Sequence, residues 1–190
     1  MKDIILLGGP NGAGKSTAAK VLLPHYLDLD TFLNADEIAR LIAPGNPDSV
    51  ALTAGRRLIE RMRTLVSEGR SFALETTCAG KSYLPLLEQC RRDHWRITLL
   101  FFWLPSSETA VERVARRVSL GGHGIPAETI HRRYRTGIGN MFNLYLPLAN
   151  EAEIYDNSLS PRVLIAEKRE GHALRIYDPE RWRQIEEMAQ

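Results

Sequence analysis

The 190-residue chain has the length of one domain: it can bury a hydrophobic core, but it is too short for two domains joined by a linker. Apolar residues make up 44% and charged residues 25% of the chain, which excludes a disordered, collagenous or disulfide-scaffold protein. The formal net charge of +2 gives no overall attraction to nucleic acid, so no nucleic-acid partner is expected. We therefore expect a single globular domain over residues 1–190.

No apolar stretch approaches the roughly 20 residues that span a bilayer, and the first residues do not have the form of an export signal. No membrane partner is therefore expected. The two cysteines, Cys78 and Cys90, are too few for a disulfide framework, and no second Cys/His pair completes a metal site. This cysteine content indicates reduced thiols in a cytoplasmic protein.

Short apolar runs alternate with segments of helical spacing, which predicts an α/β fold with a doubly wound, mostly parallel sheet. The expected strands cover residues 3–8, 31–34, 72–74, 97–104 and 154–155. The expected helices cover about 17–23, 35–42, 48–68, 106–120 and 126–147. In the helix that begins near Ser106, the inward stripe is expected to consist of Ala110, Val111, Val114 and Val118.

The pattern changes after residue 158. Two stretches, 162–168 and 173–177, flank Glu170 and Gly171, which predicts a β-hairpin before a last helix that begins at Pro179. We therefore expect a core over residues 3–158 and a structural C-terminal hairpin and helix over 160–190.

One segment carries a specific chemical motif. Residues Gly9, Pro10, Asn11, Gly12, Ala13, Gly14, Lys15 and Ser16 match G-x-x-x-x-G-K-S/T, directly after the first strand and before the helical stretch that begins at Thr17. The backbone N–H groups of such a loop and the start of the following helix bind phosphate. Lys15 is expected to bridge the β- and γ-phosphates of ATP, and Ser16 to bind Mg²⁺ through its hydroxyl. The alternative, a glycine-rich turn without a ligand, does not require this flanking strand and helix.

A phosphate loop alone is compatible with a mechanochemical ATPase, a GTPase-type switch or a small-molecule kinase. The L-S-G-G-Q motif of transporter ATPases and the N-K-x-D motif that reads guanine are both absent from the sequence. By elimination, the kinase interpretation is strongest. A kinase of another free or nucleotide-linked sugar, and a nucleotide-switched ATPase with a protein or nucleic-acid partner, stay open as alternatives.

Asp36 follows the second predicted strand, so it should emerge at the carboxyl edge of the sheet beside the phosphate loop, where ligands bind. A carboxylate there can accept a proton from an attacking hydroxyl or help to hold Mg²⁺. Asn34 and Glu37 also have the spacing of a helix-capping pair. Both interpretations can hold at once, with Asn34 capping the helix and Asp36 taking part in the chemistry.

Glu75, Thr76 and Thr77 end the third predicted strand in the same way and indicate a substrate site at the same edge. The alternative is that Thr76 or Thr77 caps the helix that leads to Leu84. Glu75 requires a partner in either case, because a lone carboxylate that continues a buried strand is strongly unfavourable.

Six arginines surround the glycine-rich segment Gly121-Gly122-His123-Gly124, and they predict a phosphate-clamping lid over about residues 113–135. A solvated charged face is the alternative for each arginine taken singly. The six are Arg113, Arg116, Arg117, Arg132, Arg133 and Arg135.

These motifs, in this order, resemble those of the zeta-toxin family of P-loop kinases, and in particular its short bacterial members. The matching stretches are 8–17, 34–39, 75–77, 117–126, 130–134 and 155–158. The resemblance covers about residues 3–158 and implies a nucleotide-kinase-like core. It also implies ATP-dependent phosphorylation of a sugar hydroxyl on a UDP-activated amino sugar, typically UDP-N-acetylglucosamine.

Carried over by matching position, the resemblance implies that Lys15 and Ser16 bind phosphates and Mg²⁺ and that Asp36 is the base. It places Glu75 and Thr77 on the substrate side and makes Arg117 a phosphate-binding arginine. A second arginine of the larger toxins has no counterpart around residues 122–123, so Arg132 or Arg133 would take its place. An antitoxin protein would be a partner on a separate chain.

Overall fold

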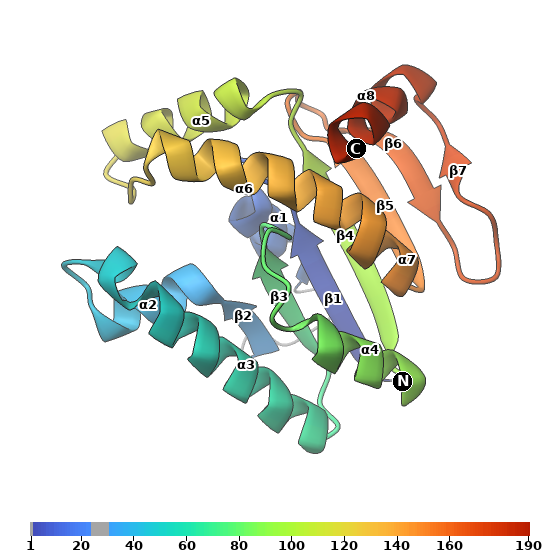
Figure 1. Ribbon diagram of the computed structural model, residues 1–190, viewed down its shortest axis with the longest axis horizontal. Helices are drawn as coiled ribbons and strands as arrows, with labels where there is room; N and C mark the ends of the chain where they lie inside the picture. The colour runs from blue at the N-terminus through green and yellow to red at the C-terminus, as the bar shows by residue number, and fades with distance from the viewer. Residues whose placement is uncertain (1, 24–30) are drawn as a thin grey trace.

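The computed structural model describes residues 2–23 and 31–190 (Figure 1). Its strands are β1 (Asp3–Gly8), β2 (Phe32–Asn34), β3 (Phe72–Thr76), β4 (Arg96–Trp103), β5 (Glu151–Asp156), β6 (Val163–Lys168) and β7 (Arg175–Ile176). Its helices are α1 (Lys15–Leu22), α2 (Ala35–Ile42), α3 (Ala51–Ser67), α4 (Leu84–Arg92), α5 (Ser107–Ser119), α6 (Ala127–Asn140), α7 (Leu146–Leu148) and α8 (Pro179–Ala189). A 3₁₀ turn, η3 (Pro47–Val50), precedes α3, and a π-helical turn, η4 (Met141–Tyr145), joins α6 to α7.

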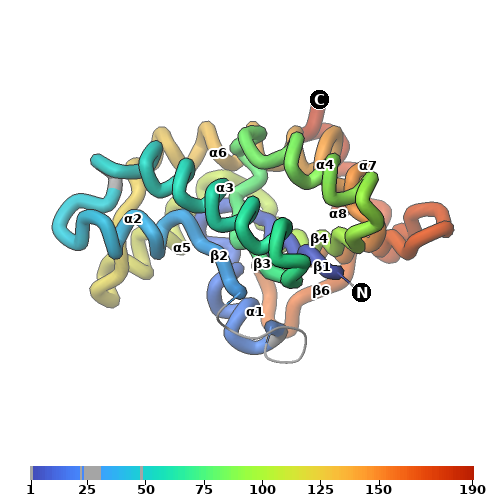
Figure 2. The backbone as a smooth tube through the Cα atoms, turned by 90° about the horizontal axis from the view of Figure 1, so that it is seen from below, coloured from blue at the N-terminus to red at the C-terminus, as the bar shows by residue number. Residues whose placement is uncertain are grey.

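The described strands form one seven-stranded sheet in the order β2-β3-β1-β4-β5-β6-β7. The strands from β2 to β5 in this order pair in parallel, and β6 and β7 extend the sheet in antiparallel fashion. Helix α1 lies on one face of the sheet, whereas α3 and α4 lie on the other (Figure 2). The predicted doubly wound, mostly parallel fold with a C-terminal hairpin and helix is therefore confirmed.

The core is centred on β1, which has β3 on one side and β4 on the other. Its residues 4–8 are all buried, and this explains why the first strand appears in the sequence as an unbroken apolar run. Because β1, β2 and β3 run parallel, their carboxyl ends meet at one edge of the sheet. The segments that follow these three strands are thereby brought together.

Two helix predictions need correction. The helix expected from Asp48 begins at Ala51, because residues 47–50 form the 3₁₀ turn; the side chain of Asp48 lies outside the described residues. In α5, Ala110 and Val114 are buried as predicted, but Val118 is 43% exposed. The last turn of α5 lies at the end of the helix farthest from the sheet (Figure 1), so its apolar stripe is not covered there. Over residues 2–23 and 31–190, we find no helix that is long and apolar enough to cross a membrane.

Candidate active site

A cleft of about 810 Å³ opens at the carboxyl edge of the parallel strands. The register of the sheet creates it: Asn34 of β2 lies opposite Glu75 of β3, and Gly8 of β1 lies opposite Thr76. The phosphate loop, the start of α2 and the β3–α4 loop therefore meet at one place. Side chains from α5 and α6 line the cleft as well.

The backbone conformation of the phosphate loop requires glycine at three positions. Gly9, Gly12 and Gly14 have φ angles of +143°, +77° and +80°, which L-residues with a side chain rarely adopt. A Cβ atom on Gly9 would also lie only 2.4 Å from the carbonyl oxygen of Phe102. Helix α1 begins directly after the loop, at Lys15, and no side chain caps its N-terminus. Its first N–H groups are consequently available to an anion, as the motif predicts.

Lys15 is almost completely buried, with 6% of its surface exposed. Its Nζ donates a hydrogen bond to the carbonyl oxygen of Pro10 at 2.9 Å and lies 3.9 Å from Oε1 of Glu75. Burial lowers the pKa of Lys15 below its ordinary value, and the carboxylates of Glu75 and Asp36 oppose this effect. A phosphate in the loop would supply the negative charge that a buried ammonium group requires.

Glu75 has the partners that its position in the sequence demands. Its Oε2 accepts a hydrogen bond from the hydroxyl of Ser16 at 2.8 Å and another from the side-chain amide of Asn34 at 3.0 Å. A hydroxyl next to a carboxylate is the kind of hard oxygen donor set that Mg²⁺ prefers, with phosphates and water as the remaining ligands. The residues present therefore fit a magnesium ion. In the described part of the chain, no cluster of three or more His, Cys, Asp or Glu residues offers another metal site.

Asp36 lines the cleft from the first turn of α2 and is exposed. The cap of that helix is Asn34, whose Oδ1 accepts hydrogen bonds from the backbone N–H groups of Asp36 at 2.8 Å and Glu37 at 3.4 Å. The predicted capping by Asn34 is therefore confirmed through these two backbone N–H groups, and it does not use the carboxylate of Asp36. This carboxylate faces the same cleft as the phosphate loop.

The prediction that Thr76 or Thr77 caps the next helix is wrong, because a loop of residues 77–83 separates β3 from α4. Tyr83 occupies the cap position of α4. Thr76 instead accepts a hydrogen bond from the backbone N–H of Cys78 at 2.9 Å and shares another with the hydroxyl of Tyr83. Thr76 and Thr77 both line the cleft.

The arginine cluster is divided by the fold. Four of its six members, Arg113, Arg117, Arg132 and Arg133, line the cleft, whereas Arg116 and Arg135 do not. The guanidinium of Arg113 donates to the carbonyl oxygens of Asn157 and Ser158, both at 2.9 Å, so it holds the segment after β5. Arg117 is exposed and donates to the carbonyl oxygen of His123 at 2.8 Å.

Sequence reasoning missed several cleft residues. Arg40 lines the cleft four residues after Asp36, on the same face of α2, and this i, i+4 spacing is a signal that could have revealed it. Leu58 and Tyr83 also line the cleft, but in the sequence they have the pattern of ordinary core residues. Asn157 donates its side-chain amide to the carbonyl oxygen of Ala13 at 2.7 Å, a contact that no local pattern predicts.

Comparison with known proteins gives one family match and one curated relative. The model of the family described as AAA domain matches residues 4–135. An uncharacterized protein of Haemophilus influenzae is 27% identical over 126 residues, which is 66% of this chain and 88% of that protein.

Two solved structures show the likeness of the fold. The AvrRxo1-ORF1:ORF2 complex with ATP has a chain that superposes with a TM-score of 0.74 at 14% identity, over 97% of this chain and 63% of that chain. A chain of the PezAT toxin–antitoxin system of Streptococcus pneumoniae superposes with a TM-score of 0.60 at 17% identity, over 88% of this chain and 71% of that chain. This chain thus spans about two thirds of the length of each. The expected P-loop fold is confirmed, and the likeness to these structures, one of them a toxin–antitoxin system, is a likeness of fold.

Proposed function

The chain belongs to the AAA domain family of P-loop proteins, and from this we propose that it is a kinase that transfers the γ-phosphoryl group of ATP to a hydroxyl of a small molecule. The observation that carries the proposal is the shared cleft: Lys15 and Ser16 of the phosphate loop, the carboxylate of Asp36 and five arginines all line it. A simple nucleotide switch would not need a carboxylate and a set of arginines in the same cleft as the phosphate loop.

The phosphate loop binds the phosphates of ATP through its N–H groups, and the N-terminus of α1 adds its partial positive charge. Lys15 moves its hydrogen bond from the Pro10 carbonyl oxygen to a phosphate oxygen, because the ammonium group then gains a charged partner. Ser16 and Glu75 would hold Mg²⁺, which when bound neutralises charge on the phosphate oxygens.

Asp36 accepts the proton of the acceptor hydroxyl as that oxygen bonds to the γ-phosphorus. The bond between this phosphorus and the bridging oxygen breaks, the electron pair leaves with ADP, and the phosphorylated acceptor and a protonated Asp36 result. Arg117, with Arg132 or Arg133, stabilises the negative charge of the transferring group. To reach the transferring phosphoryl group, Arg117 must release the carbonyl oxygen of His123. The glycine segment 121–124 would therefore move as a lid.

For the acceptor we propose a UDP-activated amino sugar such as UDP-N-acetylglucosamine, and for the place of action the cytoplasm. Support comes from the cations of the cleft, which suit a nucleotide-linked and therefore anionic sugar, and from the fold that the chain shares with the PezAT toxin–antitoxin system. The fold shared with this toxin–antitoxin system also supports an antitoxin protein as a partner.

The test is incubation of the protein with ATP, Mg²⁺ and a panel of UDP-sugars, followed by mass spectrometry of the acceptors. We expect one acceptor to gain the mass of one phosphoryl group, and a Lys15→Ala variant of unchanged fold to give none. A parent protein that hydrolyses ATP only when a protein or nucleic acid is added, and modifies no sugar, would replace the kinase with a nucleotide switch.

A further inference from the structure

The backbone of residues 78–80, which follows β3 along the cleft, is held by α6 and by the π-helical turn η4 that continues it. Asn140, the last residue of α6, donates its side-chain amide to the carbonyl oxygens of Cys78 at 2.9 Å and Ala79 at 3.2 Å. Tyr145, the last residue of η4, donates its hydroxyl to the carbonyl oxygen of Gly80. Three successive carbonyl groups of one loop are thus bound by side chains of the continuous helical segment formed by α6 and η4.

Gly137 lets the helix approach this closely. A Cβ atom at Gly137 would lie 2.3 Å from the carbonyl oxygen of Thr77, a distance at which the loop or the helix has to move. Gly139, only two residues further along the same helix, has no such constraint, because a Cβ atom there would come no closer than 3.8 Å to its nearest neighbour, the Ala189 oxygen. The close packing is therefore specific to the face of α6 that meets the loop.

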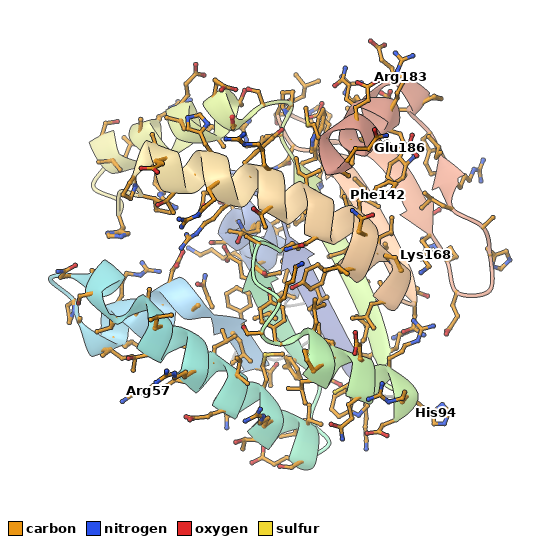
Figure 3. All side chains as sticks on the ribbon, viewed as in Figure 1. Arg57, His94, Phe142, Lys168, Arg183 and Glu186 are labelled. Carbon is orange, nitrogen blue, oxygen red and sulfur yellow. The ribbon has the colours of Figure 1, made fainter. Side chains whose placement is uncertain are left out.

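The π-helical turn explains how Asn140 and Tyr145 can bind the same loop. In an α-helix, two residues five positions apart point about 140° away from each other. The wider π turn, whose hydrogen bonds join residues five apart, brings such positions back toward one face. Phe142 of the same turn points to α8 (Figure 3), where its ring packs against Trp182 with centroids 5.6 Å apart. The turn is therefore packed on both sides.

The other side of the held loop faces the cleft. Thr77, Ala79 and Gly80 line it together with Asp36 and Arg40 of α2 and with Arg132, Arg133 and Thr136 of α6. The phosphate loop lines the cleft with Lys15 and Ser16, where the phosphates of ATP would lie. The acceptor must then lie against the remaining lining, of which residues 77–80 are a part.

We infer that Gly137 and Asn140 are positioning residues for the acceptor: they fix the backbone of residues 77–80 and thereby the fit of the acceptor to Asp36, without taking part in nucleotide binding. The inference rests on the proposed kinase function. It predicts that a small displacement of this loop weakens acceptor binding and leaves ATP binding unchanged.

The kinetic test compares Gly137→Ala with the matched control Gly139→Ala. Initial rates are measured against the concentration of UDP-N-acetylglucosamine, and ATP affinity is measured separately by titration of a fluorescent ATP analogue. We expect Gly137→Ala to raise the acceptor KM roughly tenfold or more, since a misplacement of about 1 Å can reduce catalysis by two orders of magnitude. ATP affinity should stay within about twofold, and Gly139→Ala should behave as the parent does. An unchanged acceptor KM, or an equal loss of ATP affinity, overturns the inference.

Asn140→Ala provides a second variant without a steric clash, and it should shift the acceptor KM in the same direction.

Cysteine labelling provides a readout that needs no acceptor. Cys78 lies in the held loop and Cys90 in α4, and both are buried, so alkylation followed by peptide mapping reports on the loop with Cys90 as the internal reference for global unfolding. We expect Gly137→Ala and Asn140→Ala to speed the labelling of Cys78 relative to Cys90. If the parent phosphorylates no UDP-sugar, the proposed function fails, and the labelling ratio alone decides whether α6 holds the loop. An unchanged ratio of Cys78 to Cys90 labelling in both variants would show that α6 does not hold the loop.

Discussion

The side-chain amide of Asn157 donates a hydrogen bond to the carbonyl oxygen of Ala13 at 2.7 Å, and so joins the phosphate loop to a segment 144 residues away. The preceding residue, Asp156, is 2% exposed and accepts a hydrogen bond from Nε of Arg181 at 2.8 Å. Arg113 holds the carbonyl oxygens of Asn157 and Ser158. The C-terminal helix α8, for which the sequence indicated only a structural role, thus supports the loop that binds phosphate.

Asn157→Asp should weaken ATP binding about tenfold, or about 1.4 kcal/mol, with the fold retained. The change keeps the shape of the side chain but replaces its donor with a carboxylate that repels the Ala13 carbonyl oxygen. Calorimetric titration with ATP measures the effect. Asn143→Asp is the matched control, because the side-chain amide of Asn143 also donates to backbone carbonyl oxygens, those of Gly139 and Ala189, but Asn143 does not line the cleft. Equal affinities in the two variants would contradict the role of Asn157.

Arg117→Ala should lower kcat by roughly 10²-fold or more with a smaller effect on ATP affinity, because the contact strengthens in the transition state. Arg132→Ala and Arg133→Ala are measured in parallel, and the one whose guanidinium replaces the second arginine of the larger toxins should show the same kinetic defect. Arg135→Ala is the control, since Arg135 does not line the cleft. A defect in Arg117→Ala that appears only as lost thermal stability would place Arg117 on a solvated face.

Glu75→Gln should raise the Mg²⁺ concentration needed for half-maximal activity about tenfold, because the amide removes the charge that a divalent cation prefers. The two hydrogen bonds from Ser16 and Asn34 to Oε2 can survive in part, so the fold should persist. Activity is measured as a function of Mg²⁺ at saturating ATP, and Glu37→Gln on the exposed side of α2 serves as control. A Mg²⁺ dependence equal to that of the parent would remove Glu75 from the metal site.

Cys78 should make the folded state less stable at alkaline pH. Burial raises the pKa of its thiol to about 12, so above the ordinary thiol pKa of about 8.5 the unfolded chain releases a proton that the folded chain keeps. Stability therefore falls as the pH rises through this window, at up to about 1.4 kcal/mol per pH unit.

Urea unfolding of the parent and of Cys78→Ala measures this effect at about pH 8 and about pH 10. The free-energy difference between the two proteins should shrink by about 2 kcal/mol on going to the higher pH, because only the parent carries the Cys78 thiol. The cavity left by Cys78→Ala is the same at both pH values and cancels. A difference that does not change with pH would mean that the thiol ionises as readily in the folded chain as in the unfolded one.

Much of the fold could be predicted because each signal was local. The apolar run of β1, the glycines and Lys15 of the phosphate loop, and the Asn34 cap of α2 all rest on residues close together in the chain. The end of β3 was harder to interpret: Glu75 was correctly expected to need a partner, but the identity of that partner depends on β2 and α1 lying beside it in the fold.

The rest could not be predicted because it depends on pairs that are distant in the sequence. The Asn157 contact with Ala13 and the Asn140 contacts with Cys78 and Ala79 exist only once β5 and α6 have packed against the loops at the sheet edge. The prediction for Val118 failed for a different reason. The regular apolar stripe of α5 continues in the sequence to Val118, but in the structure Val118 is not buried by neighbouring elements. The roles of the cleft residues in catalysis stay predictions.

Transfer of labelled phosphate from γ-labelled ATP to UDP-N-acetylglucosamine, by the parent and by Asp36→Asn, tests the central proposal most directly. Asparagine has the size of aspartate but cannot accept the hydroxyl proton, and Asn34 still caps α2, so the variant should fold and bind ATP as the parent does. We predict transfer by the parent and a loss of at least about 10²-fold in Asp36→Asn. Transfer at the parental rate by Asp36→Asn would show that Asp36 is not the base, and the absence of transfer by the parent would contradict the proposed acceptor.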